Sequence, residues 1–194
     1  MAFARVVSAQ PGFPSAKLVS VECDFSEGLH SFTVVGLPDK AVEEARDRVN
    51  SAIKHSGFTP PRKHNRKVVI SLAPADIKKE GPLFDVSIAL AYLLASQDVF
   101  FNPDEKLFLG ELALDGSIRS VYGGLSVAHA AQIAGVRELY VPEANAREAA
   151  LITGIKIIPV RTLRELVAHL ELTAGTKRKQ NNPDTPGKPL APQP

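Results

Sequence analysis

The chain has 194 residues, of which 44% are hydrophobic and 23% are charged, and its formal net charge is +2. These values are typical of one soluble domain with a buried core, followed by a tail. The single cysteine, Cys23, excludes an internal disulfide, and the five histidines lack metal-ligand spacing, so we expect no metal site.

The N-terminal segment has no continuous apolar stretch long enough for a signal peptide or a membrane span. We therefore expect a cytoplasmic protein with no membrane partner. The mild excess of positive charge comes from local clusters of lysine and arginine. These clusters, rather than the net charge of the whole surface, indicate where a charged partner would bind.

Three short segments rich in β-branched residues come first, at residues 3–9, 16–25 and 31–36. Turn-forming residues separate them, which is typical of antiparallel strands. In the second segment Val19, Val21 and Cys23 alternate with polar residues, so we expect one buried face and one wet face.

A helix is predicted over residues 38–56, because apolar side chains recur there at helical spacing. Asp39 suits its start and Gly57 its end. Its carboxylates alternate with basic residues, and Glu44 lies four residues before Arg48. This pattern favours a solvated, self-paired helix face over an acid–base site.

A basic loop precedes the next predicted strand, at residues 68–73, and two further lysines follow that strand. The cations concerned are Arg62, Lys63, Arg66 and Lys67 before the strand, and Lys78 and Lys79 after it. They are our candidates for contacts with nucleic-acid phosphates. The strand separates the two groups, so they need not form one patch, and the alternative is that these side chains are merely solvated.

The segment KEGPLFDVSIAL follows, with Gly81-Pro82 and then Leu83 at the mouth of a helix that is predicted to reach about residue 97. Residues 107–121 are predicted to form a hairpin, because Asp115-Gly116 is a two-residue turn signal between apolar segments. A Gly-Gly step then opens another predicted helix.

The remaining segments alternate between strand and helix: ELYVP, EANAREAALI, IKIIPV and TLRELVAHLEL. This alternation predicts parallel strands with crossover helices. We therefore expect an α+β domain over residues 1–172. Residues 173–194 are rich in proline, glycine, asparagine and lysine, which predicts a flexible basic linker or tail and suggests that the natural chain continues.

Four long motifs resemble one known family: VVGLPDKAVEEARDRV, SLAPADIKKEGPLFDVSIALAYL, FLGELALDGSIRSVYGGLSVAHAA and VPEANAREAALI. In this order they resemble the N-terminal domain of the ComM/YifB family, which are magnesium-chelatase-like AAA+ ATPases. The resemblance implies the fold of the second domain of ribosomal protein S5, which is similar to the proteolytic domain of Lon.

The resemblance to Lon also implies where a catalytic dyad would lie. In active Lon-type proteases a Gly-Pro step precedes the nucleophilic serine, and a Gly-Gly-Leu step precedes the lysine base. This chain has Leu83 and Ser126 at those positions. Leucine has no atom that attacks a carbonyl, and serine is no general base near neutral pH. We expect no catalysis, although a displaced pair of Ser87 with Lys78 or Lys79 is an alternative.

The resemblance implies that the parent protein is a ring-forming, hexameric motor that promotes DNA branch migration in natural transformation and recombination. The chain has no GxxxxGK[ST] motif, so ATP and Mg²⁺ are expected only in an AAA+ module that these residues lack. The leading hypothesis is a non-catalytic accessory domain that engages single-stranded or branched DNA, or that shapes the oligomer. The alternatives are a peptidase with a relocated dyad and a pure protein-interaction domain.

Overall fold

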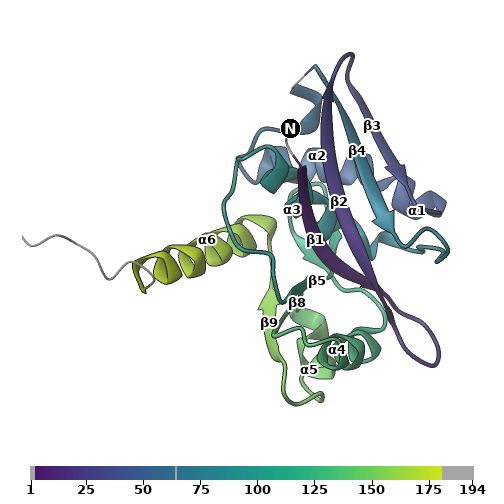
Figure 1. The fold of residues 1–194 in the computed structure, drawn as a ribbon, viewed down its shortest axis with the longest axis vertical. Coiled ribbons are helices and arrows are strands. Elements are labelled where there is room, and N and C mark those ends of the chain that lie inside the picture. Colours follow the sequence, from purple (N-terminus) through teal and green to yellow (C-terminus); the bar gives the residue numbers. More distant parts are fainter. Residues whose placement is uncertain (1–2, 64, 181–194) are drawn as a thin grey trace, which may run out of the picture.

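The computed structural model describes residues 3–63 and 65–180, and its centre is a seven-stranded sheet in the order β3-β4-β2-β1-β5-β8-β9 (Figure 1). Two further strands, β6 and β7, form a separate two-stranded sheet. The strands are β1 (Phe3–Gln10), β2 (Lys17–Glu27), β3 (Ser31–Val35), β4 (Arg66–Ala73), β5 (Lys106–Phe108), β6 (Glu111–Leu112), β7 (Ile118–Arg119), β8 (Glu138–Pro142) and β9 (Lys156–Val160).

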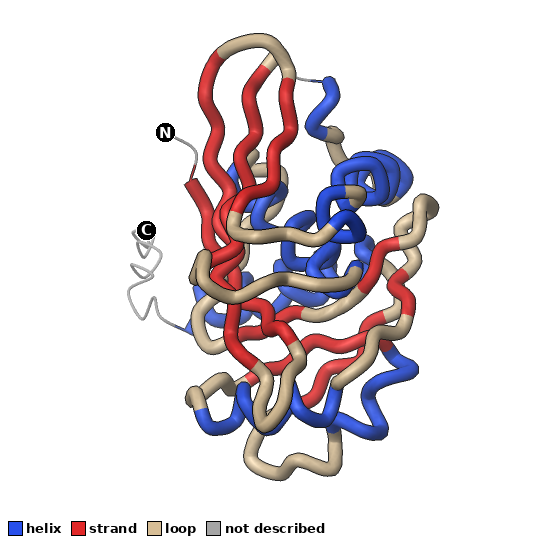
Figure 2. Tube along the Cα trace, turned by 90° about the vertical axis from the view of Figure 1, so that its right-hand side faces the viewer, coloured by secondary structure: helices blue, strands red, loops and turns tan. Residues whose placement is uncertain are grey.

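The helices are α1 (Lys40–Glu43), α2 (Ala45–His55), α3 (Asp85–Ala95), α4 (Gly124–Ile133), α5 (Ala146–Ala149) and α6 (Leu163–Gln180), with short 3-10 turns at Pro61–Lys63, Pro82–Phe84 and Glu143–Asn145. Strands β1 to β4 lie on one side and the helices α2 and α3 on the other (Figure 2). Residues Val19, Val21 and Cys23 of β2 are fully buried toward these helices, while the polar residues between them are partly or fully exposed. The predicted wet face of this strand is therefore confirmed.

The sheet combines antiparallel and parallel pairing, which confirms the α+β prediction. Strand β2 is antiparallel to both β1 and β4, whereas β1, β5, β8 and β9 are parallel neighbours. The expectation that the first three strands pair antiparallel in sequence order is wrong for β3. This strand pairs parallel with β4, because the intervening helices carry the chain across one face of the sheet.

The β6–β7 hairpin confirms the predicted turn but corrects its length. Ala113 and Ser117 close the loop through an N–H to carbonyl bond of 2.9 Å, which leaves three residues between them. Gly116 has a φ of +88° and supplies the left-handed residue that such a loop requires. The Asp115 carboxylate accepts bonds from the Ser117 N–H and hydroxyl at 2.9 and 2.7 Å.

The helix boundaries show two further differences from the sequence prediction. The helix predicted over residues 38–56 is split at Glu44, although the Asp39 carboxylate caps its start by accepting a bond from the Val42 N–H at 2.9 Å. Helix α6 passes the predicted boundary at residue 172, so residues 173–180 are helical. Residues 181–194, the remainder of the predicted tail, lie outside the described residues. No helix in the described part is long and apolar enough to cross a membrane.

Candidate functional site

The segment that carries Leu83 is held rigidly at the start of α3. Gly81 donates its N–H to the Asp39 carboxylate at 3.0 Å. The Leu83 carbonyl accepts from Gly110 at 3.1 Å, and the Gly110 carbonyl accepts from Val86 at 3.2 Å. The Leu83 side chain is fully buried in the core. At this position the chain therefore has an apolar packing residue.

Ser126 lies in the first turn of α4. Gly123 caps this helix in a left-handed conformation with a φ of +80°. The Ser126 hydroxyl donates to the Gly123 carbonyl at 3.0 Å, so its proton is used in a local bond. A serine in this arrangement offers no basic group to a neighbouring nucleophile.

The Gly-Pro and Gly-Gly-Leu segments lie close together, as the resemblance to Lon implies. Gln10 joins them: its side-chain oxygen accepts from the Glu80 N–H at 2.8 Å, and its amide donates to the Tyr122 hydroxyl at 3.2 Å. A Cβ atom on Gly81 would lie 3.5 Å from the Tyr122 ring. Gln10 and Tyr122 are not predicted from the sequence, since no motif marks a side chain that bridges segments so far apart.

A buried ion pair is formed by Asp85, the first residue of α3, two residues after Leu83. The Arg48 guanidinium makes two bonds to the Asp85 carboxylate, at 2.6 and 3.0 Å, and a third to the Ala41 carbonyl at 2.8 Å. The Leu112 N–H donates to the same carboxylate at 3.1 Å. The side chain of Asp85 is fully buried and that of Arg48 is 19% exposed. The pair links α2, α3 and β6.

Burial dominates the protonation of Asp85. Loss of solvation raises its pKa to about 6, and the attraction of Arg48 and the Leu112 N–H opposes this rise only in part. The interpretation of Arg48 as part of a solvated face, paired with Glu44, is therefore wrong. Its partner is 37 residues away along the chain.

The structure does not assemble the alternative dyad. Ser87 is fully buried and donates its hydroxyl to the Phe108 carbonyl at 2.8 Å. Lys78 is exposed and pairs with Glu80 at 2.7 Å. The Lys79 ammonium donates to the Pro74 carbonyl. Neither lysine is bonded to Ser87, so the geometry gives no support to a relocated serine–lysine pair.

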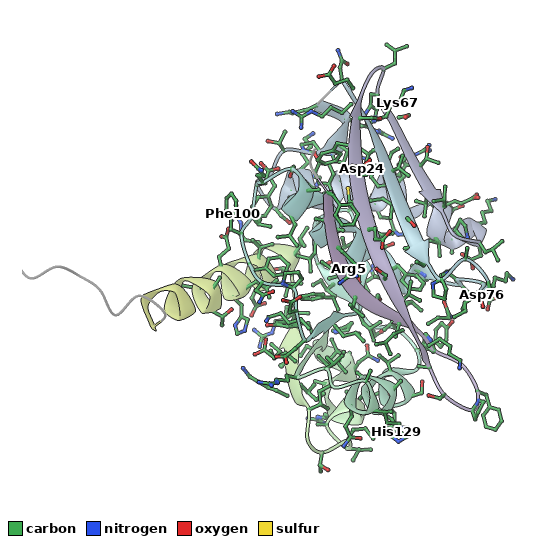
Figure 3. The ribbon with its side chains drawn as sticks, in the orientation of Figure 1. Arg5, Asp24, Lys67, Asp76, Phe100 and His129 are labelled. Carbon is green, nitrogen blue, oxygen red and sulfur yellow. The ribbon has the colours of Figure 1, made fainter. Side chains whose placement is uncertain are left out.

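Four of the predicted phosphate contacts lie together at one end of β4, and we call Arg62, Lys63, Arg66 and Lys67 the basic ridge. All four are exposed. Arg62 pairs with Asp47 at 2.5 Å, and the Arg66 guanidinium lies 5.9 Å from the centre of the Phe25 ring. Among the described residues the other three cations make no ion pair. Lys67 is labelled at the top of Figure 3.

Lys78 and Lys79 are separated from the basic ridge by the length of β4, about 25 Å for a strand of eight residues. Lys79 is fully buried, and burial lowers the pKa of its ammonium group. A buried side chain cannot contact a phosphate, so we withdraw Lys79 from the candidates. Lys78 is exposed but already shares its charge with Glu80.

The described residues contain no group of three or more histidine, cysteine or carboxylate side chains that could hold a metal ion. The site that the structure offers is a junction of two loops and an ion pair, with a separate cationic surface.

Comparison with known proteins first gives the class of domain. The chain is 25% identical to the Lon protease of Rhizobium meliloti over 162 residues, which are 79% of this chain and 20% of that protein. The fold and the paired loops described above agree with a Lon-like domain. A family model described as subunit ChlI of Mg-chelatase matches residues 21–145, and the chain belongs to this family.

Two relatives are more similar. The chain is 44% identical to YifB of Escherichia coli K12 over 158 residues, which are 81% of the chain and 30% of that protein. It is 39% identical to the competence protein ComM of Haemophilus influenzae over 171 residues, which are 88% of the chain and 33% of that protein. The predicted resemblance to these proteins is confirmed. The chain spans about a third of the length of either relative.

Proposed function

We propose that these residues form a non-catalytic accessory domain of a longer AAA+ ATPase that acts on DNA. The observation that carries the proposal is the geometry at the two Lon positions: Leu83 is buried, and the Ser126 hydroxyl is bonded to a backbone carbonyl. A Lon-like scaffold without a nucleophile or a base at these positions is suited to binding and assembly.

The name of the relative ComM refers to competence, and its similarity to the chain supports a role in DNA transactions. The proposed parent is a cytoplasmic hexameric ring that drives branch migration of recombining DNA during natural transformation. The ATP and Mg²⁺ that such a motor needs would bind in a separate AAA+ module, since this chain has no P-loop motif.

The basic ridge is the proposed contact with single-stranded or branched DNA. Lys63, Arg66 and Lys67 are exposed and not ion-paired within the described residues, so their charge is available to phosphates. Cations that neutralise phosphates release counterions, which makes binding depend on salt concentration. The stacking of Arg66 on Phe25 orients one of these cations.

Replacing Arg62, Lys63, Arg66 and Lys67 together by alanine is expected to weaken binding to single-stranded DNA and to reduce the salt dependence. Each lost phosphate contact reduces the magnitude of the slope of log K against log salt by about 0.7. Arg62 is already paired with Asp47, so we count three lost contacts, which reduce the slope by about 2. Fluorescence anisotropy of a labelled oligonucleotide at 50 to 200 mM salt, a range chosen around physiological ionic strength, measures both quantities.

The control for this experiment removes the same charge elsewhere. Lys40, Lys54, Arg137 and Arg147 are exposed and lie outside the basic ridge. Their combined replacement by alanine is expected to leave most of the slope in place. An equal loss of DNA affinity in both variants would show that the basic ridge is not the DNA contact. If the unmodified domain does not bind DNA at low salt, DNA contact is removed from the proposal.

Incubation with unfolded protein substrates is expected to give no cleavage products, because the Ser87 hydroxyl is buried and bonded to the Phe108 carbonyl. The measurement is mass spectrometry of the substrate after incubation, with the Ser87→Ala variant in parallel. Cleavage that disappears in Ser87→Ala would establish the relocated dyad and contradict the proposed function.

A further inference from the structure

The loop between β1 and β2, residues 11–16, presents a phenylalanine to solvent. The side chain of Phe13 is 100% exposed. Gly12 and Pro14, on either side of it, are also exposed, so the ring has no cover from its neighbours. A phenyl ring is a large apolar surface, and rings of this kind dominate the energetics of protein interfaces. We call residues 11–16 the Phe13 loop.

A groove with complementary chemistry lies between the segment after α3 and the outer part of α6. Its volume is about 690 Å³, which is in the range of cavities that enclose a drug-sized ligand. We call it the Phe100 groove, and its lining is mainly apolar: Leu94, Val99, Phe100, Phe101, Ala174 and Gly175, with Asn102 and Glu171 as the polar members. Phe100 is 67% exposed.

The groove is held in place from both sides. The Phe100 N–H donates to the Glu171 carboxylate at 3.3 Å, which ties the segment to α6. Phe101 packs edge-on against the buried ring of Phe108, with ring centres 6.0 Å apart. The surface that Phe100 presents is therefore anchored to the core.

The Phe13 loop and the Phe100 groove lie on opposite sides of the molecule. In Figure 1 the β1–β2 loop is at the lower right and α6 at the left, and Phe100 is labelled on the left of Figure 3. The two surfaces of one chain therefore cannot meet. We propose that the Phe13 loop of one copy inserts into the Phe100 groove of a second copy, in a head-to-tail contact.

Charge complementarity favours a second copy as the occupant. Lys17 is exposed at the base of the Phe13 loop. Asp98 and Glu171 are exposed at the Phe100 groove, one beside its lining and one within it. A contact that inserts Phe13 brings the lysine of one copy near the carboxylates of the next, and opposite potentials of this kind steer association and fix register.

The contact joins two different surfaces, so each copy keeps one free loop and one free groove. Such heterologous contacts build closed rings, or filaments where the rotation does not close. A single phenylalanine buries about 150 to 250 Å². This is small against the 1,200 to 2,000 Å² that a stable interface buries in total, so the isolated domain is expected to associate weakly.

Cysteine cross-linking tests the head-to-tail geometry directly. The natural Cys23 is buried, and burial raises the pKa of its thiol to about 12, so it stays unreactive. A mixture of a Phe13→Cys chain and an Ala174→Cys chain is expected to give a disulfide-linked dimer on mild oxidation. Either variant alone is expected to give several-fold less.

Three results would overturn the proposal. A mixture that forms no more dimer than the single variants shows that loop and groove do not meet. Efficient dimerisation of the Phe13→Cys chain alone shows a symmetric contact instead. The third result uses one chain that carries both Ala174→Cys and Leu190→Cys. If this chain forms an intrachain disulfide in dilute solution, while the Phe13→Cys and Ala174→Cys mixture forms no dimer, the groove is occupied by the C-terminal segment of the same chain.

The strength of the contact is measured by sedimentation of the domain over a range of concentrations. Phe13→Ala is expected to weaken association at least tenfold, while Leu29→Ala, which removes another exposed apolar side chain in a different loop, leaves it unchanged. Lys17→Glu is expected to weaken it, and adding Asp98→Lys in the same chain is expected to restore it, because Asp98 takes no part in the bond that ties the Phe100 segment to α6. Equal effects of the Phe13 and Leu29 changes would refute the proposal.

This inference deepens the assembly part of the proposed function and does not depend on DNA binding. The variant without the basic ridge is expected to cross-link normally, and Phe13→Ala is expected to bind the oligonucleotide with unchanged salt dependence. The two proposals therefore fail in different measurements.

Discussion

Replacing Arg48 by alanine is expected to lower the free energy of unfolding by about 3 to 5 kcal/mol, which is the usual cost of removing one partner from a buried ion pair. The reason is the environment of Asp85, whose side chain is fully buried while that of Arg48 is 19% exposed. Without Arg48 the carboxylate keeps, among the residues that the structure describes, the single bond from the Leu112 N–H. Urea unfolding followed by circular dichroism measures the loss.

The loss is expected to depend on pH in a defined direction. In the native domain the pKa of Asp85 is raised to about 6, above its ordinary value of 3.8. The folded state thus binds the Asp85 proton more tightly than the unfolded state does. The stability that this group contributes is fully present below pH 3.8 and is lost as the pH rises through 6. Removing Arg48 raises the pKa further, so the two proteins should differ most above pH 7 and least near pH 4.

Arg46→Ala is the matched control, because Arg46 lies on the same helix, is half exposed and forms an ion pair with its neighbour Asp47, at 3.5 Å. Its replacement is expected to change stability by less than about 0.5 kcal/mol. If Arg48→Ala costs no more than Arg46→Ala, or if its cost does not change with pH, the ion pair does not have the structural role assigned to it here.

Most strands and helices could be predicted from local patterns, but the order of strands could not. The short link between β2 and β3 favours a hairpin, yet β4 lies between these two strands in the sheet. A strand, a helix and a further strand in succession are the usual signature of parallel pairing, and β3, α2 and β4 follow it. The sequence therefore contains two conflicting signals, the turn residues between β2 and β3 and the strand-helix-strand succession. The folded chain follows the second one.

In the candidate site, too, some residues can be placed from local motifs, whereas the environment of others depends on tertiary contacts. The positions of Leu83 and Ser126 follow from the Gly-Pro and Gly-Gly-Leu motifs alone. The burial of Lys79 does not, because it depends on backbone bonds of this residue to Leu37 and Asp39, at 3.0 and 2.9 Å. Local spacing likewise favours Glu44 as the partner of Arg48, whereas the folded chain offers a desolvated carboxylate where an ion pair is stronger.

Leu83→Ser is expected to lower the free energy of unfolding by about 3 to 5 kcal/mol. The substitution places a serine where the resemblance to Lon expects the nucleophile. Leu83 is fully buried, so a serine there leaves a cavity, which costs about 2 to 5 kcal/mol for a leucine truncated to alanine. It also buries a hydroxyl group, which adds a penalty unless the group finds a hydrogen bond. Urea unfolding measures the change.

Leu125→Ser provides the comparison, since Leu125 lies in the Gly-Gly-Leu segment and is 41% exposed. Its replacement is expected to cost less than about 1 kcal/mol, because much of the side chain already contacts water. A large difference between the two variants would identify Leu83 as a packing residue on which the stability of the domain depends. Equal, small losses would show that position 83 tolerates a hydroxyl group, and the apolar residue would then need an explanation other than packing.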